Sequence, residues 1–463
     1  MARDPEDIPT GRARRATRAT TALAPSTVRF ASSLAASVVR SPERAGDILE
    51  RRHEEIADHA VEVLSGLRGG AMKLGQLASF VDVEFLPPRY REIYQERLAG
   101  LRDAAPAMGW RKVRGVLERE WGAAPESLFE EFDERATAAA SIGQVHRAVL
   151  PGGRAVAVKV QYPEIADAVA ADLDLASVGI RLAKAFAPGL DPAVVAGELR
   201  ERIMEELDYE LEAQHQRFFA RAYRGHPAIH VPEVVTELSR RRVTVSDWVE
   251  GRPFSEVVAL PQADRDRLGE VMYRFYLGSM HRLRRFNTDP HPGNYMLMED
   301  GRMAFIDFGS TKVVDADWLA AGDAAVAAAM DGDVDAHYRA AEAMGYFHRP
   351  ERIDRDWLMR STTTGMDWVL RDEEVRIDQE YVARVMAAML DPSPEAIRLA
   401  RSMKVPPDEI WFRRMSVGVF AVLGHLRASA NWHRLAREYI FGDEPRTELG
   451  RAERELFARS GRA

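Results

Sequence analysis

One stretch of the 463-residue chain constrains its fold most, because three oxygen-bearing side chains occur there at a telling spacing. Asn294 follows Asp289 by five residues, and Asp307, inside the run Phe-Ile-Asp-Phe-Gly, follows it by eighteen. Amide and carboxylate oxygens are hard ligands that Mg²⁺ accepts together with phosphate and water. Asp-Pro, Pro-Gly and Gly-Asn pairs are also common in plain turns, but the combination favours chemistry. We expect Asn294 and Asp307 to hold Mg²⁺, and Asp289 to orient or deprotonate an acceptor hydroxyl or water.

This spacing is typical of the catalytic loop and metal-binding segment of kinases. Upstream, the run Val-Ala-Val-Lys-Val around Lys159 is similar to the kinase strand whose lysine pairs with the nucleotide phosphates and with a helical glutamate. A lysine in an apolar strand is costly without a partner, although an edge strand would let its amine reach solvent. Asp289 and Lys159 are therefore predicted to be catalytic residues.

The segment before that strand would cover the nucleotide phosphates, yet it contains no G-x-G-x-x-G. Small residues let backbone N–H groups approach a phosphate, but alanine resists the positive φ that glycine allows. We therefore expect ATP to be held differently from a standard kinase, although an alanine run read alone is more typical of a helix. The predicted nucleotide-binding residues, besides Lys159, are Ala138, Ala139, Ala140, Ser141, Ile142, Gly143, Gln144 and Val145.

Two further motifs have no standard chemistry by themselves. The first lies in the run Met-Lys-Leu-Gly-Gln and comprises Lys73, Gly75 and Gln76. The second is an acidic helical segment at 205–213, in which Glu206, Glu210 and Glu212 would ordinarily be a solvated face.

Taken together, these five elements resemble the UbiB (ADCK) type of atypical kinase-like proteins, with its K-x-G-Q, alanine-rich and E-x-D motifs. The resemblance covers about 69–309 and the flanking helices more loosely. It implies Mg²⁺ and ATP as cofactors and a pairing of Lys159 with Glu212, which makes Glu212 the third predicted catalytic residue. It also implies a regulatory K-x-G-Q helix, with Lys73 facing Glu206 and Asp208 where a peptide substrate would otherwise lie. Asn-Thr replaces the His-Arg that precedes the kinase catalytic aspartate, and no A-P-E follows Asp307.

The pattern of elements predicts an α+β, bilobal protein-kinase-like fold with an added N-terminal helical subdomain. The predicted parts are an Arg-rich disordered tail (1–25), a helical extension with K-x-G-Q (26–125), a β-rich N-lobe (126–250), a helical C-lobe (251–440) and a loose charged tail (441–463). Within them we expect a hairpin split by Pro-Gly-Gly at 151–153, a helix at 193–221, strands at 231–237 and 242–248, and a buried helix at 415–426.

The composition limits the classes of partner and site that this chain can have. A net charge of −8 argues against a general nucleic-acid binder, and the lack of cysteine excludes disulfides and thiolate sites. No signal peptide or membrane-spanning run is evident, so we expect a cytoplasmic protein with at most peripheral contact at the inner face of the membrane. The first 40 residues carry a net charge of +4, from seven Arg against three acids, which suits either an anionic membrane surface or a solvated tail. The oligomeric state is left open, a homodimer included.

The resemblance implies an ATPase that supports isoprenoid quinone or prenyl-lipid metabolism, with an isoprenoid lipid or quinone precursor as partner. Two alternatives remain open: a small-molecule phosphotransferase, and a nucleotide-gated scaffold without turnover. A protein kinase is the least favoured interpretation, since the K-x-G-Q helix would occupy the peptide site.

Overall fold

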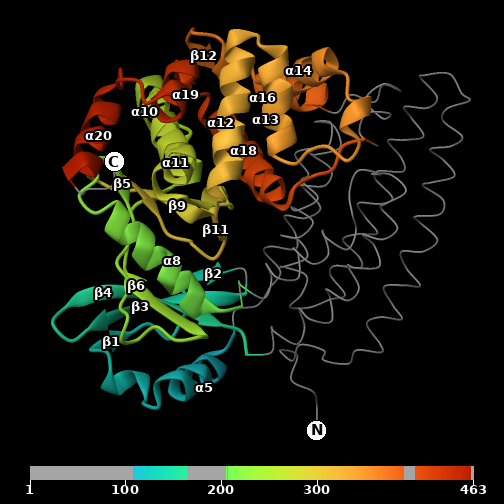
Figure 1. Cartoon of the computed structure of the whole chain (residues 1–463). Helices are drawn as coiled ribbons and strands as arrows, with labels where there is room; N and C mark the ends of the chain where they lie inside the picture. Colours follow the sequence, from blue (N-terminus) through green and yellow to red (C-terminus); the bar gives the residue numbers. More distant parts are fainter. Residues whose placement is uncertain (1–107, 141, 164–204, 206, 390–401, 460–463) are drawn as a thin grey trace, which may run out of the picture. The chain divides into compact units, whose positions relative to one another are not determined.

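The computed structural model describes residues 108–140, 142–163, 205, 207–389 and 402–459 (Figure 1). The chain divides into two compact units. Among the described residues, it passes from unit 1 to unit 2 at Asp208, returns to unit 1 at Arg240 and enters unit 2 again at Thr244. The described part of unit 1 is 108–163 without 141, residues 205 and 207, and 240–243; that of unit 2 is 208–239, 244–389 and 402–459. The predicted 1–25 tail, most of the helical extension, Lys73, Gly75, Gln76, Ser141 and Glu206 lie outside the described residues.

Unit 1 is built on an antiparallel hairpin, as predicted. β3 (Gly143–Leu150) pairs with β4 (Arg154–Gln161), and Gly152 and Gly153 both have positive φ in the connecting turn. The hydrogen-bonded order within unit 1 is β1-β3-β4, with β2 also on β3; β1 is Glu131–Phe132 and β2 is Ala138–Ala140. Strand β6 (Val243–Asp247) starts at the last residue of unit 1 and continues in unit 2. In β4 the buried residues Val156, Val158 and Val160 alternate with more exposed ones, as expected for a strand covered on one face.

A short amphipathic helix, α5 (Trp110–Trp121), contacts β4. It buries Val113, Val116 and Leu117 at the i, i+3, i+4 spacing of a single helix face. It ends at Gly122, whose left-handed φ of 67° suits glycine.

Unit 2 begins with α8 (Tyr209–Ala222), which corrects the prediction of one helix over 193–221. The Asp208 side chain accepts hydrogen bonds from the backbone N–H groups of Glu210 and Leu211, so this residue caps a helix that starts at Tyr209. The expected strand at 231–237 is also wrong. Only an isolated bridge joins Val234 to Ser246, next to Pro232, which lacks the N–H that a ladder needs.

The rest of unit 2 is mostly helical, with short strands at its loops. Its β strands form a sheet of order β5-β10-β9-β7 and two pairs, β8 with β11 and β12 with β13. The strands are β5 (Ile229–His230), β7 (Arg252–Pro253), β8 (Arg285–Asn287), β9 (Tyr295–Leu297), β10 (Met303–Phe305), β11 (Thr311–Val313), β12 (Val375–Arg376) and β13 (Ser429–Ala430). The helices are α9 (Phe254–Val257), α10 (Gln262–Tyr273), α11 (Ser279–Leu283), α12 (Ala316–Asp331), α13 (Val334–Ala343), α14 (Arg355–Thr363), α15 (Asp367–Leu370), α16 (Gln379–Met389), α18 (Pro407–Leu426), α19 (Trp432–Ile440) and α20 (Glu448–Arg459).

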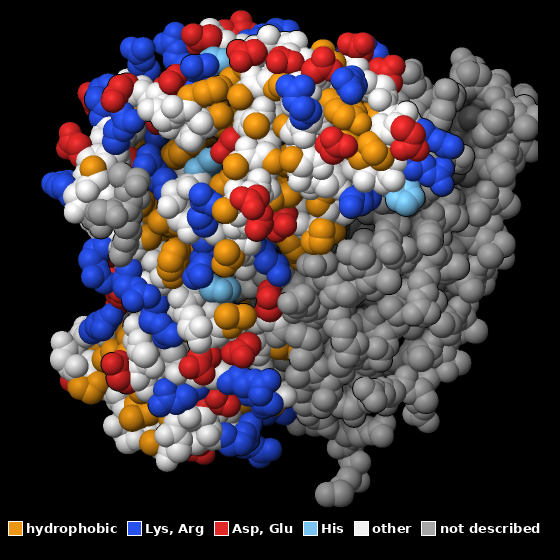
Figure 2. Space-filling model, in the orientation of Figure 1, with side chains coloured by type: hydrophobic (Ala, Val, Ile, Leu, Met, Phe, Trp, Pro, Cys, Tyr) orange, Lys and Arg blue, Asp and Glu red, His pale blue; other side chains and the backbone are white. Residues whose placement is uncertain are grey.

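Two of these helices bear on the sequence predictions. α18 contains the predicted buried helix at 415–426, and most of that stretch is inaccessible to solvent. The predicted loose tail instead contains α20, which buries Glu453 and Phe457 completely. The sequence did not predict this helix, because the segment is highly charged and a buried, paired glutamate looks the same in a sequence as a solvated one. On the face of unit 2 shown in Figure 2, basic and acidic side chains are intermixed, with apolar side chains between them.

Candidate functional site

The site is built on the loop that follows β8. β8 and β11 pair antiparallel, with Asn287 opposite Thr311, so the two segments that carry Asp289 and Asp307 run side by side. The Asn287 side chain, which is 2% exposed, donates to the carbonyl of Asp307 at 2.7 Å and accepts from the N–H of Asp289 at 2.8 Å. One buried amide therefore ties the two predicted functional segments together.

Asp289 and Asn294 also contact each other directly. The Asn294 Nδ2 atom donates to Asp289 Oδ2 at 3.2 Å and to the Asp289 carbonyl at 3.3 Å. In turn, the carbonyl of Asn294 accepts from the N–H of Ile306 at 3.1 Å, next to Asp307. The loop thus brings together all three residues that the spacing singled out.

The Asp-Phe-Gly segment is anchored by its central aromatic ring. Phe308 is fully buried and packs on Phe219 of α8, with ring centroids 5.1 Å apart. Asp307 Oδ1 accepts from the N–H of Gly309 at 3.0 Å. A methyl group built on Gly309 would lie 3.4 Å from Asp307 Oδ1 and 3.6 Å from Glu212 Oε2. The buried Glu212 carboxylate of α8 is therefore a close neighbour of this segment.

The donor set suits Mg²⁺. Asn294 points its amide nitrogen at Asp289, so its amide oxygen faces away from that carboxylate, and Asp307 Oδ1 accepts from the Gly309 N–H. An amide oxygen and a carboxylate oxygen are ligands that Mg²⁺ takes when phosphate and water fill the other positions. In the part of the chain that the structure describes, no group of three or more His, Asp or Glu side chains is placed to hold a metal ion on its own.

Arg414, from α18, completes the surroundings of Asp289, and the sequence analysis did not find it. Its Nη2 donates to Asp289 Oδ1 at 2.8 Å, and its Nε donates to the carbonyl of Thr288 at 3.1 Å. Burial by itself would raise the pKa of the Asp289 carboxyl. The charges of Arg414 and His291, with the hydrogen bonds from Arg414 and Asn294, outweigh burial and hold that pKa below its usual value.

Thr288 and Ser310 were missed as well, and they hold the loop in register. The Thr288 N–H donates to the Ser310 carbonyl at 2.7 Å, and the two hydroxyl groups hydrogen-bond to each other. Both residues are buried. No local pattern marks them, because their partners lie some twenty residues away and Arg414 is more distant still.

The predicted phosphate-covering residues and Lys159 lie in unit 1. Ala138–Ala140 form β2, paired with β3, which overrides the helical preference of alanine. Lys159 is half-buried in β4, opposite Val145. Ile142 is buried, and so is the Gln144 side chain, which accepts from the Met108 N–H at 2.7 Å and contacts His146. The pairing of Lys159 with Glu212 and the nucleotide contacts of this segment stay predictions.

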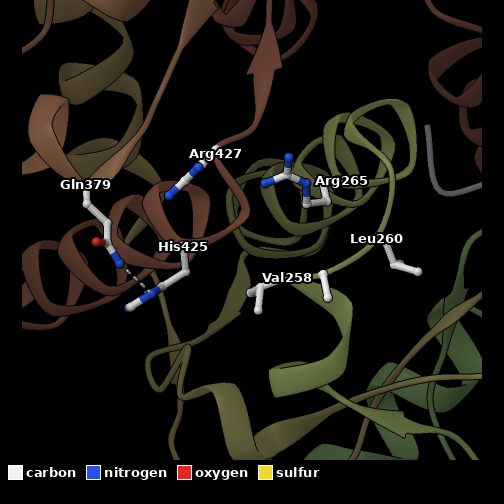
Figure 3. A pocket seen from close by; sticks show the side chains of 7 residues that line it. Val258, Leu260, Arg265, Gln379, His425 and Arg427 are labelled. Carbon is white, nitrogen blue, oxygen red and sulfur yellow. Dashed lines mark hydrogen bonds between the residues drawn. The ribbon is translucent and has the colours of Figure 1, made fainter.

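The cavity shown in Figure 3 has a volume of about 400 Å³ and contains none of the predicted site residues. Apolar residues line one side, and Gln379 contacts His425 at 3.1 Å on another. The lining residues are Val258, Ala259, Leu260, Arg265, Gln379, His425 and Arg427. The candidate site is therefore identified by its chemistry rather than by a cavity. None of the described helices combines the length and the apolar character needed to cross a membrane.

Comparison with known proteins also indicates a kinase-like protein. Residues 100–340 match the ABC1 atypical kinase-like domain. The chain is 28% identical over 402 residues to "Atypical kinase coq-8, mitochondrial" of Caenorhabditis elegans, covering 84% of this chain and 52% of that one. It is 34% identical over 260 residues to "Atypical kinase COQ8B, mitochondrial" of Danio rerio, covering 56% and 41%. The chain thus spans about half the length of these curated relatives or less.

A solved structure is also similar. It is described as the complex structure of Rv3197–erythromycin from Mycobacterium tuberculosis, with 31% identity, a TM-score of 0.63, and coverage of 86% of this chain and 100% of that one. The mixed α+β, kinase-like fold expected from the sequence is confirmed. The matched domain accounts for 241 of 463 residues, more than half of the chain. The chain therefore belongs to the ABC1 atypical kinase-like family, which confirms the resemblance to the UbiB type.

Proposed function

We propose that this chain binds Mg²⁺-ATP and hydrolyses it, in support of isoprenoid quinone or prenyl-lipid metabolism. The observation that carries the proposal is the joint placement of Asp289, Asn294 and Asp307 by Asn287 and the Asn294 hydrogen bonds. The family match gives the kinase-like setting. The link to quinones and lipids comes from the motif resemblance alone.

The proposal gives each of the three residues a separate role. Asn294 and Asp307 would hold Mg²⁺, which when bound neutralises charge on the phosphate oxygens. Asp289, held on both carboxylate oxygens, would orient a water for in-line attack on the terminal phosphorus. That step forms one P–O bond and breaks the bond to the bridging oxygen of ADP, and the water protons end on phosphate and solvent. The transition state of such transfers is loose, so positioning matters more than a strong base.

A second candidate is a phosphotransferase that acts on a hydroxyl of a small molecule. The similar Mycobacterium tuberculosis structure is described as a complex with erythromycin, a small molecule rather than a peptide. In this alternative Asp289 would orient the acceptor hydroxyl in place of water.

The decisive experiment measures phosphate release from Mg²⁺-ATP by the purified full chain, with and without anionic liposomes that contain a prenyl-phenol. We expect release that rises with the lipid and that Asp307→Asn abolishes, together with Mg²⁺-nucleotide affinity at least about 10- to 100-fold weaker, because a charged ligand is lost. Asp300→Asn is the matched control, since Asp300 is an exposed carboxylate paired with Arg302.

Unchanged Mg²⁺-ATP binding by Asp307→Asn in a thermal-shift titration would refute the metal role. Clear ATP binding without phosphate release would favour the phosphotransferase or a nucleotide-gated scaffold.

A further inference from the structure

α18 lies against the catalytic loop along one face. Trp411, Arg414 and Gly418 follow the i, i+3, i+7 spacing of a helix stripe. The Lys312 ammonium of β11 lies 5.4 Å from the centre of the Trp411 ring, and Arg414 reaches Thr288 and Asp289. Two successive turns of this helix, at Arg414 and Gly418, therefore contact the segment that carries the predicted catalytic residue, and the turn before them contacts the neighbouring strand β11.

Gly418 sets how closely the helix approaches. A Cβ atom at this position would lie 2.3 Å from Cγ of Pro290, the residue after Asp289. Real side chains do not tolerate such a distance, so the helix backbone can lie here only because residue 418 is glycine. The close approach brings Arg414, one turn earlier, within hydrogen-bond range of Asp289.

Arg414 holds Asp289 by two separate groups. Its guanidinium spans the Thr288 carbonyl and the Asp289 carboxylate at 3.1 and 2.8 Å, which fixes the main chain and the side chain together. Asn294 holds the other carboxylate oxygen at 3.2 Å. A planar guanidinium suits such two-point contacts better than an ammonium does. The two side chains remain 20% and 32% exposed, so this pair lies at a surface that a substrate can reach.

We propose that Arg414 is a positioning residue for the phosphoryl transfer, and that α18 is the support that keeps Asp289 aimed at the attacking water or hydroxyl. The inference rests on the proposed function and deepens it. Arg414 and Gly418 both lie beyond residue 340, outside the segment that matches the family domain. The part of the chain after that domain thus supplies a component of the site.

Steady-state ATP hydrolysis by Arg414→Gln tests this directly. Losing the guanidinium frees the carboxylate to rotate, and we expect kcat to fall about 10- to 100-fold, the scale of a small misplacement of a reacting group. KM for Mg²⁺-ATP should stay within about twofold, because the Arg414 hydrogen bonds to Thr288 and Asp289 act on the residue that orients the attacking group; this pattern separates positioning from binding. Arg414→Lys should recover part of kcat, because an ammonium keeps the charge but not the two-point geometry.

Two further variants complete the design. Gly418→Ala keeps the Arg414 side chain but should still lower kcat, because the added methyl meets Pro290 and forces α18 away from the Asp289 loop. Arg434→Gln is the matched control: Arg434 forms an exposed pair with Asp372 at 2.7 Å and should hydrolyse ATP like the wild type.

The outcomes are distinguishable. Wild-type turnover with an Arg414→Gln kcat within twofold of it would overturn the positioning role and leave the proposed function standing. A raised KM with unchanged kcat would also overturn it, in favour of a binding role. If the wild type hydrolyses no ATP under any condition, both proposals fail. Should Arg414→Gln not fold, Arg414→Lys decides: a kcat equal to that of the wild type would contradict the need for the guanidinium geometry.

Discussion

Two arginine–carboxylate pairs of unit 2 have nearly the same length but different surroundings. Arg274 and Glu453 are 2.9 Å apart and neither side chain is exposed, whereas Arg414 and Asp289 are 2.8 Å apart and are 20% and 32% exposed. The distance between the partners therefore says little about what a pair does. Burial decides whether a pair is available to a substrate or sealed into the protein.

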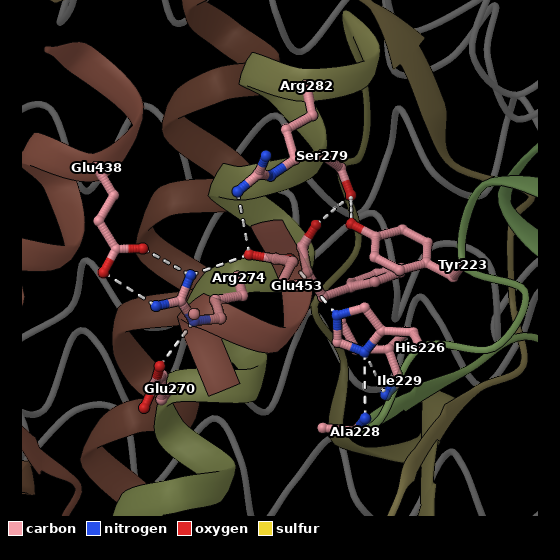
Figure 4. A network of polar contacts seen from close by, with 12 residues as sticks. Tyr223, His226, Ala228, Ile229, Glu270, Arg274, Ser279, Arg282, Glu438 and Glu453 are labelled. Atoms are coloured by element: carbon pink, nitrogen blue, oxygen red, sulfur yellow. Dashed lines mark hydrogen bonds and ion pairs between the residues drawn. The ribbon is translucent and has the colours of Figure 1, made fainter. Parts of the chain in front are cut away.

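The buried pair belongs to a larger polar network (Figure 4). Arg274 lies in the π-helical turn Arg274–Gly278 and contacts Glu270 at 2.7 Å, Glu438 at 2.8 Å and Glu453 at 2.9 Å. Through Glu438 and Glu453 it ties the last two helices of the described chain, α19 and α20, to the turn that follows α10. One side chain thus fastens three elements.

Two further side chains, Arg282 and His226, lie close to Glu453. Arg282 lies 3.4 Å from Glu453 Oε2, and His226 Nε2 lies 3.6 Å from Oε1. The N–H groups of Ala228 and Ile229 donate to His226 Nδ1, which places the imidazole proton on Nε2, toward Glu453. The side chains of Arg274 and Glu453 are fully buried, while the Asp289 side chain keeps 32% of its surface exposed. We infer that the first network serves stability and the second serves the site.

The largest expected effect comes from Arg274→Met. Removing the guanidinium leaves buried carboxylates without their cation, and breaking such a pair typically costs about 3–5 kcal/mol. The urea dependence of tryptophan fluorescence should show this loss, while Arg434→Gln, which removes an exposed pair, should leave the urea midpoint close to that of the wild type. If the Arg274 variant unfolds at the wild-type urea concentration, the network does not hold the C-terminal helices.

The next largest expected effect is that the stability contributed by Glu453 depends on pH. Although burial alone would raise the pKa of Glu453, His226, Arg274 and Arg282 lower it from 4.5 to about 2. A carboxyl whose pKa is lower in the folded than in the unfolded protein stabilises the fold fully when the pH is above its unfolded-state pKa. This stabilisation is lost as the pH falls toward the folded-state pKa, here from about pH 4.5 to about pH 2. The pKa difference corresponds to roughly 3 kcal/mol.

Unfolding of the wild type and of Glu453→Gln should therefore be compared between pH 7 and pH 3. We expect the stability gap between them to narrow as the solution is acidified. Burial raises the pKa of Glu438, which acts in the opposite direction, and the loss of the Glu453 charge in the variant makes that rise smaller. A gap that is constant over this range would show that Glu453 is not ionised in the folded protein.

The smallest effect sharpens the comparison most. Because the pair is partly exposed, Arg414→Gln should alter the free energy of unfolding by no more than about 1 kcal/mol. A thermal melt of this variant, run beside that of Arg274→Met, checks the difference. Similar losses in both would mean that the two pairs have the same structural role.

Several parts of the protein could be predicted from the sequence, since their signals are local. The spacing of Asp289, Asn294 and Asp307 marks three residues that the loop brings together. The glycines at 152 and 153 predicted the turn between β3 and β4, and the apolar run at 415–426 predicted the buried part of α18. In each case the chemistry needed for the inference lies within about twenty residues of chain.

Other features depend on partners far along the chain. Ala138–Ala140 form a strand because β3 lies beside them, against the preference of alanine for helix. The helix predicted over 193–221 is interrupted at Asp208, because the carboxylate of this residue caps the start of α8. The charged segment after 441 becomes a helix with a buried glutamate because Arg274, far earlier in the chain, pairs with it.

The sequence by itself determined the family, the kinase-like fold and the residue types of the candidate site, because these follow from short-range spacing. Only the tertiary structure decided that Arg414 meets Asp289 while Arg274 meets Glu453. In sequence all four are ordinary charged residues. Which charges are sealed and which stay accessible depends on how helices pack, and packing joins residues more than a hundred positions apart.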